Sequence, residues 1–239
     1  MSSRSTPGVG SPRVAPETGN PATADDLTVV GVDFGLRKLF VAAPAANPPT
    51  IEHALEVDGG DVEDVFKAFH TRTQELRALD VDTWEAEGLL LRRCEAWFRD
   101  CFAAAAAQLL SYLDRTDADV VALEDTCWTP SSLAEQRHKA ADPAPWVLPT
   151  CQQRLAEALK PTEYRVRLIE PEGTTTRCHC CGEEGARTQD GFRCHNEECP
   201  VTLVDDDRGA AVTVARRAKR RAVNQPPGEQ GQEVSESNA

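Results

Sequence analysis

The stretch Leu27-Thr28-Val29-Val30-Gly31-Val32-Asp33-Phe34-Gly35 decides the fold of this chain. Its apolar run is rich in β-branched residues, which is typical of a strand. Gly35 then supplies a tight turn, and a second apolar run extends from Leu36 to Ala43. The pattern predicts a strand, a glycine turn and a returning strand, with Asp33 where the first strand ends.

Two further acidic residues stand in comparable positions. Glu124 closes the apolar run that begins at Val120, and Asp207 opens an alanine-rich segment with a helical pattern. Carboxylates at two strand ends and one helix start can converge on hard divalent cations, which prefer oxygen ligands. We therefore expect Asp33, Glu124 and Asp207 to be the catalytic ligands of Mg2+ or Mn2+ in a site for two-metal phosphoryl chemistry. The alternative is that these residues only cap strands and helices.

Four cysteines predict a separate zinc module. Cys178 and Cys181 form one knuckle, and Cys194 and Cys199 form a second with a wider gap. A structural zinc site needs four ligands, and two such knuckles can supply them. Alternative donors are present, namely Cys180, His179 and His195. Cys94 and Cys101 lie on an apolar helical stripe and are expected in the core.

Composition limits the class of protein. The chain has 239 residues and no apolar stretch long enough to span a membrane, which predicts a soluble protein without a membrane partner. Nine cysteines without a visible signal peptide indicate a reducing cytoplasm and metal binding in preference to disulfides. The net charge of -13, with lysine scarce beside arginine, resembles the acidic proteomes of salt-loving archaea. We take this charge as an adaptation to solvent, which carries no information about binding partners.

One segment reverses the sign of the charge. Six cations and no acid occur between residues 208 and 221: Arg208, Arg216, Arg217, Lys219, Arg220 and Arg221. Such a run can pair with the carboxyl end of a helix or can face the phosphates of a nucleic acid. We retain both interpretations and treat these six residues as candidate nucleic-acid contacts.

The remaining patterns divide the chain. Residues 1–26 and 223–239 are poor in apolar residues and are expected to be disordered tails. The core domain is expected at 27–222, with the zinc module at 174–204 inserted in it. A third strand is predicted near 51–57, helical stretches near 62–79 and 90–109, and a loop over 129–149. A helix through Lys160, capped by Thr150 and Gln153, and a strand over 164–169 follow.

The order of these motifs resembles the carboxyl-terminal half of the transposon-encoded OrfB/TnpB family, relatives of the type V CRISPR effector nucleases. The matching segments are Gly31 to Lys38, Val121 to Asp125, Ile169 to Pro171 running into Thr174 to Cys178, and Asp205 to Ala211. The resemblance implies an α/β fold of the RNase H-like, RuvC type, a mixed sheet flanked by helices with a zinc ribbon inserted. It also implies magnesium-dependent cleavage of DNA with Asp33, Glu124 and Asp207 as metal ligands.

Two departures from the family shape the functional hypotheses. Gly209 stands where the family commonly has Asn, and Asp205 and Asp206 compete with Asp207 for the ligand role; Asp207 keeps the usual offset to the Ala-Ala pair. Only 32 residues precede Asp33, whereas guided nucleases of the family carry a long recognition region there. The first hypothesis is a DNA endonuclease, and the second is a non-cleaving nucleic-acid-binding remnant or regulator. In both, DNA is the expected partner, with RNA as an alternative, and binding is expected to be weak and tolerant of sequence.

Overall fold

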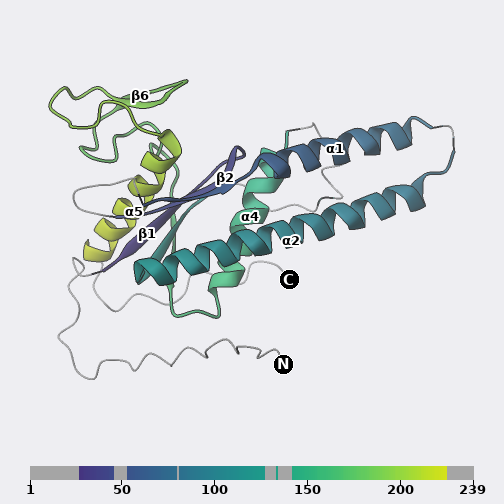
Figure 1. Ribbon diagram of the computed structural model, residues 1–239, viewed down its shortest axis with the longest axis horizontal. Helices are drawn as coiled ribbons and strands as arrows, with labels where there is room; N and C mark the ends of the chain where they lie inside the picture. The colour runs from purple at the N-terminus through teal and green to yellow at the C-terminus, as the bar shows by residue number, and fades with distance from the viewer. Residues whose placement is uncertain (1–26, 46–52, 80, 127–132, 134–141, 225–239) are drawn as a thin grey trace, which may run out of the picture.

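A computed structural model describes residues 27–45, 53–79, 81–126, 133 and 142–224. Figure 1 shows a central sheet with helices on both faces and a small hairpin module above it. The strands and helices are, in chain order, β1 (Val29–Phe34), β2 (Lys38–Pro44), β3 (Leu55–Asp58), α1 (Gly60–Arg77), α2 (Trp84–Thr116), β4 (Val120–Glu124), α4 (Ala144–Leu159), β5 (Arg165–Ile169), β6 (Gly185–Thr188), β7 (Gly191–Cys194) and α5 (Asp206–Asn224). None of the helices in these described ranges is long and apolar enough to cross a membrane.

The main sheet has five strands in the order β3-β2-β1-β4-β5. β2 pairs antiparallel with β1 and with β3, whereas β4 lies parallel to β1 and β5 lies parallel to β4. The sheet is therefore mixed, with the parallel pairing confined to one side of β1. The register of β1 on β4 aligns Val32 with Leu123, so the next position on each strand is Asp33 and Glu124.

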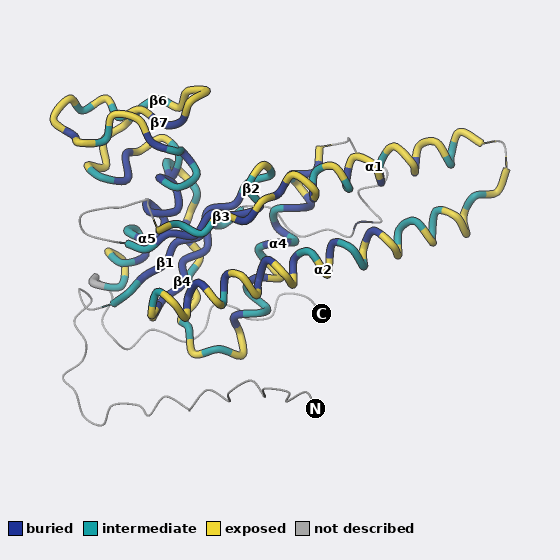
Figure 2. Tube along the Cα trace, in the orientation of Figure 1, coloured by how far each residue is buried: buried dark blue, intermediate teal, exposed yellow. Residues whose placement is uncertain are grey.

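Alternation along the strands assigns each residue to one of two layers. Val30 and Val32 face a large core shared with α1, α2 and α4, as do Val121 and Leu123 of β4. Val29, Val120 and Ala122 face α5 on the other side, where Val214, Ala215 and Ala218 cover them. Because side chains alternate with a period of two, Asp33 and Glu124 both point to the α5 face. The dark tube of Figure 2 shows that β1 and β4 are buried between these layers.

Gly31 sets how closely α5 approaches the sheet. A Cβ atom at Gly31 would lie 2.2 Å from the Ala211 carbonyl oxygen and 2.4 Å from the Ala215 backbone nitrogen. The helix backbone thus occupies the space that any side chain would need. Asp207 lies one helical turn before Ala211, and α5 therefore starts at the end of β1 that carries Asp33.

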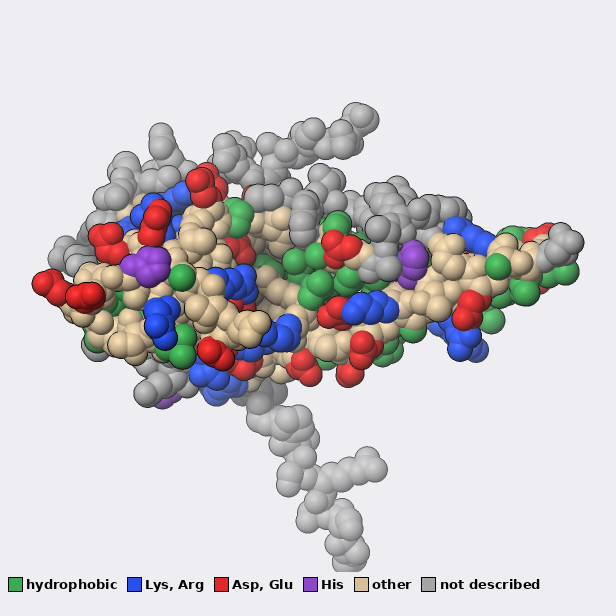
Figure 3. All heavy atoms as spheres, turned by 90° about the horizontal axis from the view of Figure 1, so that it is seen from above, with side chains coloured by type: hydrophobic (Ala, Val, Ile, Leu, Met, Phe, Trp, Pro, Cys, Tyr) green, Lys and Arg blue, Asp and Glu red, His purple; other side chains and the backbone are tan. Residues whose placement is uncertain are grey.

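The helices α1 and α2 form a hairpin that extends beyond the sheet (Figure 1). Aromatic contacts stabilise the part near the sheet, such as that of Phe98 with Trp146, whose ring centroids lie 4.7 Å apart. Hydrophobic side chains also reach the surface at the far end of the hairpin (Figure 3), and Leu79, Val81, Trp84 and Leu89 are 47–71% exposed.

The structure confirms most of the expected elements and corrects the others. The RNase H-like mixed α/β fold is confirmed, and β1, β2, β5 and the two helical stretches lie where the sequence indicates them. The expected loop up to 149 is wrong in its last part, because α4 begins at Ala144 and includes Pro149. The expected cap by Thr150 and Gln153 is wrong for the same reason: both lie inside α4, where the Thr150 hydroxyl donates to the Trp146 carbonyl. Pro143 is the N-cap and Pro145 lies in the first turn, where no backbone N–H is needed, so the prolines were misleading there. Helix α5 continues to Asn224, past the expected tail boundary; residues 1–26 and 225–239 lie outside the described residues.

We predict that Gly31→Ala lowers the free energy of unfolding by about 2 to 4 kcal/mol, because the new methyl group must push α5 away from β1. Gly88→Ala is the matched control: it lies in α2, and its nearest neighbour would be the flexible Arg92 side chain at 3.4 Å. That change should stabilise the protein by about 0.5 to 1 kcal/mol. Denaturant unfolding in concentrated potassium chloride measures both, and equal midpoints for Gly31→Ala and the natural protein would refute the close-approach constraint.

Candidate functional site

Asp33 and Glu124 form a buried pair of carboxyl groups on neighbouring parallel strands. Asp33 is 5% exposed and Glu124 is 9% exposed. Burial raises the pKa of Asp33 well above its ordinary value, and the charge of Glu124 and a hydrogen bond between the two side chains raise it further. Two carboxyl groups in contact within an apolar sheet repel each other when both are ionised. The pair is therefore suited to a cation that neutralises both.

Contacts from two other segments fix Glu124. The hydroxyl of Thr174, itself buried, donates to Glu124 Oε1 at 2.6 Å. The Gln152 side chain of α4 donates from Nε2 to the Glu124 backbone carbonyl at 2.9 Å. Glu124 is thus held at the end of β4 by the segment that leads into the zinc module and by a helix of the opposite layer.

Asp205 acts as the cap of α5. Its Oδ1 accepts a hydrogen bond from the Arg208 backbone N–H at 3.0 Å, as expected of a residue that precedes the first helical turn. Its Oδ2 lies 2.7 Å from Lys38 Nζ. Burial works against ionisation, but the hydrogen bonds from Lys38 and the Arg208 backbone dominate and lower the pKa of Asp205. Asp205 therefore has a structural role that its position before the helix explains.

The carboxylates of Asp206 and Asp207 differ in their hydrogen-bond and ion-pair partners. Asp206 is buried and receives a direct hydrogen bond from Arg187 Nε on β6. Asp207 has only longer charge contacts, with Arg37 at 3.6 Å and with Lys38 and Arg187 at 3.7 Å. The negative charge of Asp207 also contributes to the raised pKa of Asp33. Among the described residues, however, the carboxylates of Asp33, Glu124 and Asp207 do not form a group within 4.8 Å of one another. Of the three acids at the start of α5, this geometry favours Asp207 as the partner of Asp33 and Glu124.

The three consecutive acids at the helix start also form a cluster of their own. Carboxylate oxygens of Asp205, Asp206 and Asp207 lie within 4.8 Å of one another. Burial raises the pKa of Asp207, and the neighbouring charge of Asp206 raises it further. The cations Arg37, Lys38 and Arg187 offset this concentration of negative charge. The sequence reasoning did not single out these three cations, although Arg37 and Lys38 directly follow the glycine turn after Asp33.

The second candidate site is the cysteine cluster of the hairpin module. One ligand atom from each of Cys178, Cys181, Cys194 and Cys199 lies within 4.8 Å of the others. Two Sγ–Sγ separations, 3.8 Å for Cys178 to Cys199 and 3.5 Å for Cys181 to Cys194, are close to the edge of about 3.8 Å expected for a tetrahedron with Zn–S bonds of about 2.3 Å. The four sulfurs thus fit zinc, and the cluster includes neither Cys180 nor the two histidines.

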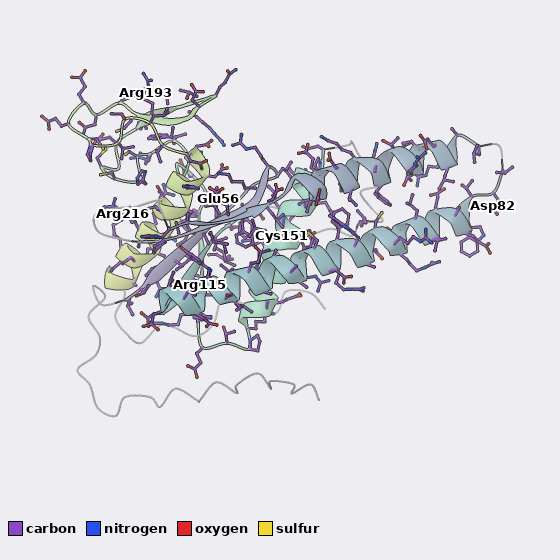
Figure 4. All side chains as sticks on the ribbon, viewed as in Figure 1. Glu56, Asp82, Arg115, Cys151, Arg193 and Arg216 are labelled. Atoms are coloured by element: carbon purple, nitrogen blue, oxygen red, sulfur yellow. The ribbon has the colours of Figure 1, made fainter. Side chains whose placement is uncertain are left out.

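Besides the Arg187–Asp206 contact, Arg216 joins this module to α5. Arg216 Nη1 donates to the backbone carbonyl oxygens of His179 and Cys180 in the first knuckle. Figure 4 labels Arg216 on α5, below the module, and Arg193 on the hairpin of the module itself. His179 is buried beside α5, with Nδ1 3.4 Å from the Cβ position of Gly209, and burial and the charge of Arg216 lower its pKa. Its Nδ1 is buried and has no hydrogen-bond partner among the described residues, so His179 packs between knuckle and helix.

The six basic residues expected to contact nucleic acid separate into groups. Arg208 lies at the start of α5 and pairs with Glu56 on β3 at 2.5 Å. Arg221 lies in the last turn and reaches Glu170 at 3.3 Å. Arg216, Arg217 and Arg220 instead line a cavity together with the first knuckle, and Lys219 does not. Arg177, which the sequence reasoning left out of the basic set, lines the same cavity.

No family model and no curated protein sequence matches this chain. Solved structures do match it in fold. A Cas12f1–sgRNA–target DNA complex matches with a TM-score of 0.60 and 15% identity, over 84% of this chain and 52% of the other. A CRISPR–Cas12f ternary complex matches with a TM-score of 0.57 and 14% identity, over 84% and 40%. The mini RNA-guided endonuclease CRISPR-Cas_phi3 matches with a TM-score of 0.50 and 13% identity, over 82% and 46%. This chain thus spans about half the length of its structural neighbours and shares their fold.

We predict one zinc ion per chain, held by the four clustered thiolates. Cys178→Ser should remove zinc and lower the melting temperature of the module, since three ligands do not close a structural site. Cys180→Ser is the matched control, because Cys180 lies in the same knuckle but outside the cluster, and it should keep the metal. Metal analysis of the purified variants measures the zinc content. Loss of zinc in Cys180→Ser but not in Cys178→Ser would show that Cys180 is the ligand in this knuckle.

We also predict that Asp33→Asn stabilises the protein in magnesium-free buffer by about 1 kcal/mol, as removal of a strained charge commonly does. A raised folded-state pKa contributes stability below the unfolded value, and that stability is lost as pH rises through the folded value. The advantage of Asn should therefore grow from pH 4 toward neutrality. Addition of Mg2+ should stabilise the natural protein but not the variant. Asp64→Asn, on the exposed face of α1, is the control; a magnesium response that survives Asp33→Asn would contradict a metal site at Asp33.

Proposed function

We propose that this protein is a divalent-metal-dependent DNA endonuclease of the OrfB/TnpB type, with Asp33, Glu124 and Asp207 as the metal ligands. The observation that carries the proposal is the buried pair of Asp33 and Glu124, aligned on parallel strands and facing the start of α5. Fold likeness to Cas12f and Cas_phi structures supports this class. Acidic side chains on one face of a sheet supply the oxygen ligands that Mg2+ and Mn2+ prefer.

The residues have separate tasks in this reaction. Two Mg2+ ions, when bound, would activate a water molecule and stabilise the leaving 3′ oxygen of the phosphodiester. Asp33 would be one of the carboxylates that hold the ions. Glu124 and Asp207 would hold one ion each, with Thr174 fixing the orientation of the Glu124 carboxylate. The cations that surround Asp207, such as Lys38, would have to shift away as the metal takes their place.

This last requirement favours a second candidate function. Arg37, Lys38 and Arg187 already lie within 4 Å of the acids at the start of α5. A protein whose carboxylates are neutralised by its own side chains can bind nucleic acid without cleaving it. The second candidate is accordingly a non-cleaving nucleic-acid-binding regulator on the same fold. DNA is the proposed partner in both cases, and RNA is the alternative.

We predict Mg2+- or Mn2+-dependent nicking of supercoiled DNA at high potassium concentration. Asp33→Ala should reduce the rate about a thousandfold, because loss of a metal ligand removes several kcal/mol of transition-state stabilisation. Glu124→Gln and Asp207→Asn should have similar effects, whereas the exposed Asp64→Asn should nick at the natural rate. DNA that is bound but never nicked, with or without Asp33, would reject the nuclease and support the regulator.

A further inference from the structure

A cavity of about 300 Å3 lies between the zinc module and α5, and its walls are strongly basic. One wall is the first knuckle, from Arg177 to Gly182; the other is formed by Thr213, Arg216, Arg217 and Arg220. The four residues from α5 follow the i, i+3, i+4, i+7 spacing of a single helix face. No carboxylate is among the residues that line this cavity.

The arginines of this cavity keep much of their positive charge uncompensated. Burial lowers the pKa of Arg217, and the like charges of Arg220, Arg177 and Arg221 lower it further. Arg217 Nη1 donates to the Glu170 backbone carbonyl at 3.1 Å, an interaction that leaves its net charge in place. Arg220 is exposed and has no acidic partner among the described residues. The cavity therefore concentrates positive charge in a protein whose net charge is -13.

Neutralisation of the helix dipole does not account for this arrangement. The dipole acts on charges in the last turn of a helix, and in α5 that turn contains Arg221 alone among the arginines. Arg216 and Arg217 lie further back, close to the middle of the helix. Arg216 also fastens the knuckle through two backbone carbonyls, so it shapes the cavity wall. Arg177 also has a long contact of 3.9 Å with Glu184, near the surface of the module. The charges of Arg217 and Arg220 remain to be explained by a ligand.

The cavity adjoins the carboxylate pair. Gly173, with a φ of +73°, has its Cβ position 3.3 Å from Arg217 Nη2 and 3.4 Å from Arg177 Nε. The next residue, Thr174, donates to Glu124. The charge of Glu124 also reaches Arg217, where it acts against the lowering of the pKa. The short segment from Glu170 to Thr174 therefore contacts Arg177 and Arg217 as well as Glu124, the candidate metal ligand.

We propose that this cavity binds a backbone phosphate of the nucleic acid, next to the phosphate held at the carboxylates. The proposal rests on the proposed function and extends it. The planar fork of Arg matches the geometry of phosphate oxygens, and several forks in one cavity favour phosphate over a single carboxylate. A nucleic-acid strand that enters a site with three carboxylates is repelled unless cations offset the negative charge of these carboxylates. Arg177, Arg217 and Arg220 supply that compensation and fix the register of the strand at the site.

The test is fluorescence anisotropy with a labelled single-stranded DNA, in magnesium-free buffer over a series of potassium concentrations. The full-length, zinc-loaded protein is compared with Arg220→Gln and with the double variant Arg177→Gln/Arg220→Gln. We expect affinity to fall about tenfold for the double variant and the slope of log affinity against log salt to shrink by about 1 for each lost phosphate contact. Arg93→Gln, on an exposed part of α2, makes the same charge change and should leave both quantities unaltered.

Two additional measurements separate the possible outcomes. Zinc content and melting temperature of the variants must equal those of the natural protein, and Arg220→Gln, at an exposed position, is the variant least able to disturb folding. Asp33→Asn should bind the DNA at least as tightly as the natural protein while failing to nick it, so binding is judged independently of cleavage. The proposal is overturned if the double variant has the same DNA affinity and salt slope as the natural protein. It is also overturned if the natural protein binds polyglutamate as tightly as DNA, or binds no DNA.

Discussion

The contact of α5 with β1 at Gly31 is the constraint on which the candidate site depends. The helix backbone lies where a side chain at Gly31 would be, so the helix axis is as close to the sheet as two backbones allow. Close packing along the helix extends the same contact, through Ala211 toward β2 and through Ala215 and Ala218 toward β4. The start of α5 is thereby fixed above the ends of β1 and β4. The separation of Asp207 from Asp33 and Glu124 follows from this single contact, because rigid elements carry all three residues.

Sequence reasoning could predict the strand-end positions of Asp33 and Glu124 and the four clustered thiolates, because their local patterns are strong. A strand that ends in an acid, and a knuckle with two cysteines, are recognisable without knowledge of any neighbour. The same holds for the layers, since the apolar runs of β1 and β4 already imply strands buried on both faces. Cys94 packs in the core as the helical stripe predicts.

Other parts of the site could not be predicted because they depend on contacts between distant segments. Thr174 and Gln152 meet Glu124 across 50 and 28 positions of the chain, and no local pattern marks either of them. Arg187 reaches Asp206 from a hairpin whose orientation depends on the fold of the module. The prolines of α4 misled the prediction for a different reason: proline at the first turn of a helix looks the same in sequence as proline in a loop.

The contact between Arg187 and Asp206 gives the cysteine cluster an influence that its distance along the chain does not suggest. Arg187 lies on β6, between the two knuckles, and its guanidinium lies among the acids at the start of α5. The four thiolates hold the hairpin in shape, and the hairpin in turn holds a positive charge over those acids. Oxidation of the thiolates or withdrawal of their metal would release that charge. The redox state and the zinc concentration of the surroundings would then determine how strongly Asp205, Asp206 and Asp207 repel one another. That repulsion in turn determines how readily these carboxylates accept a cation.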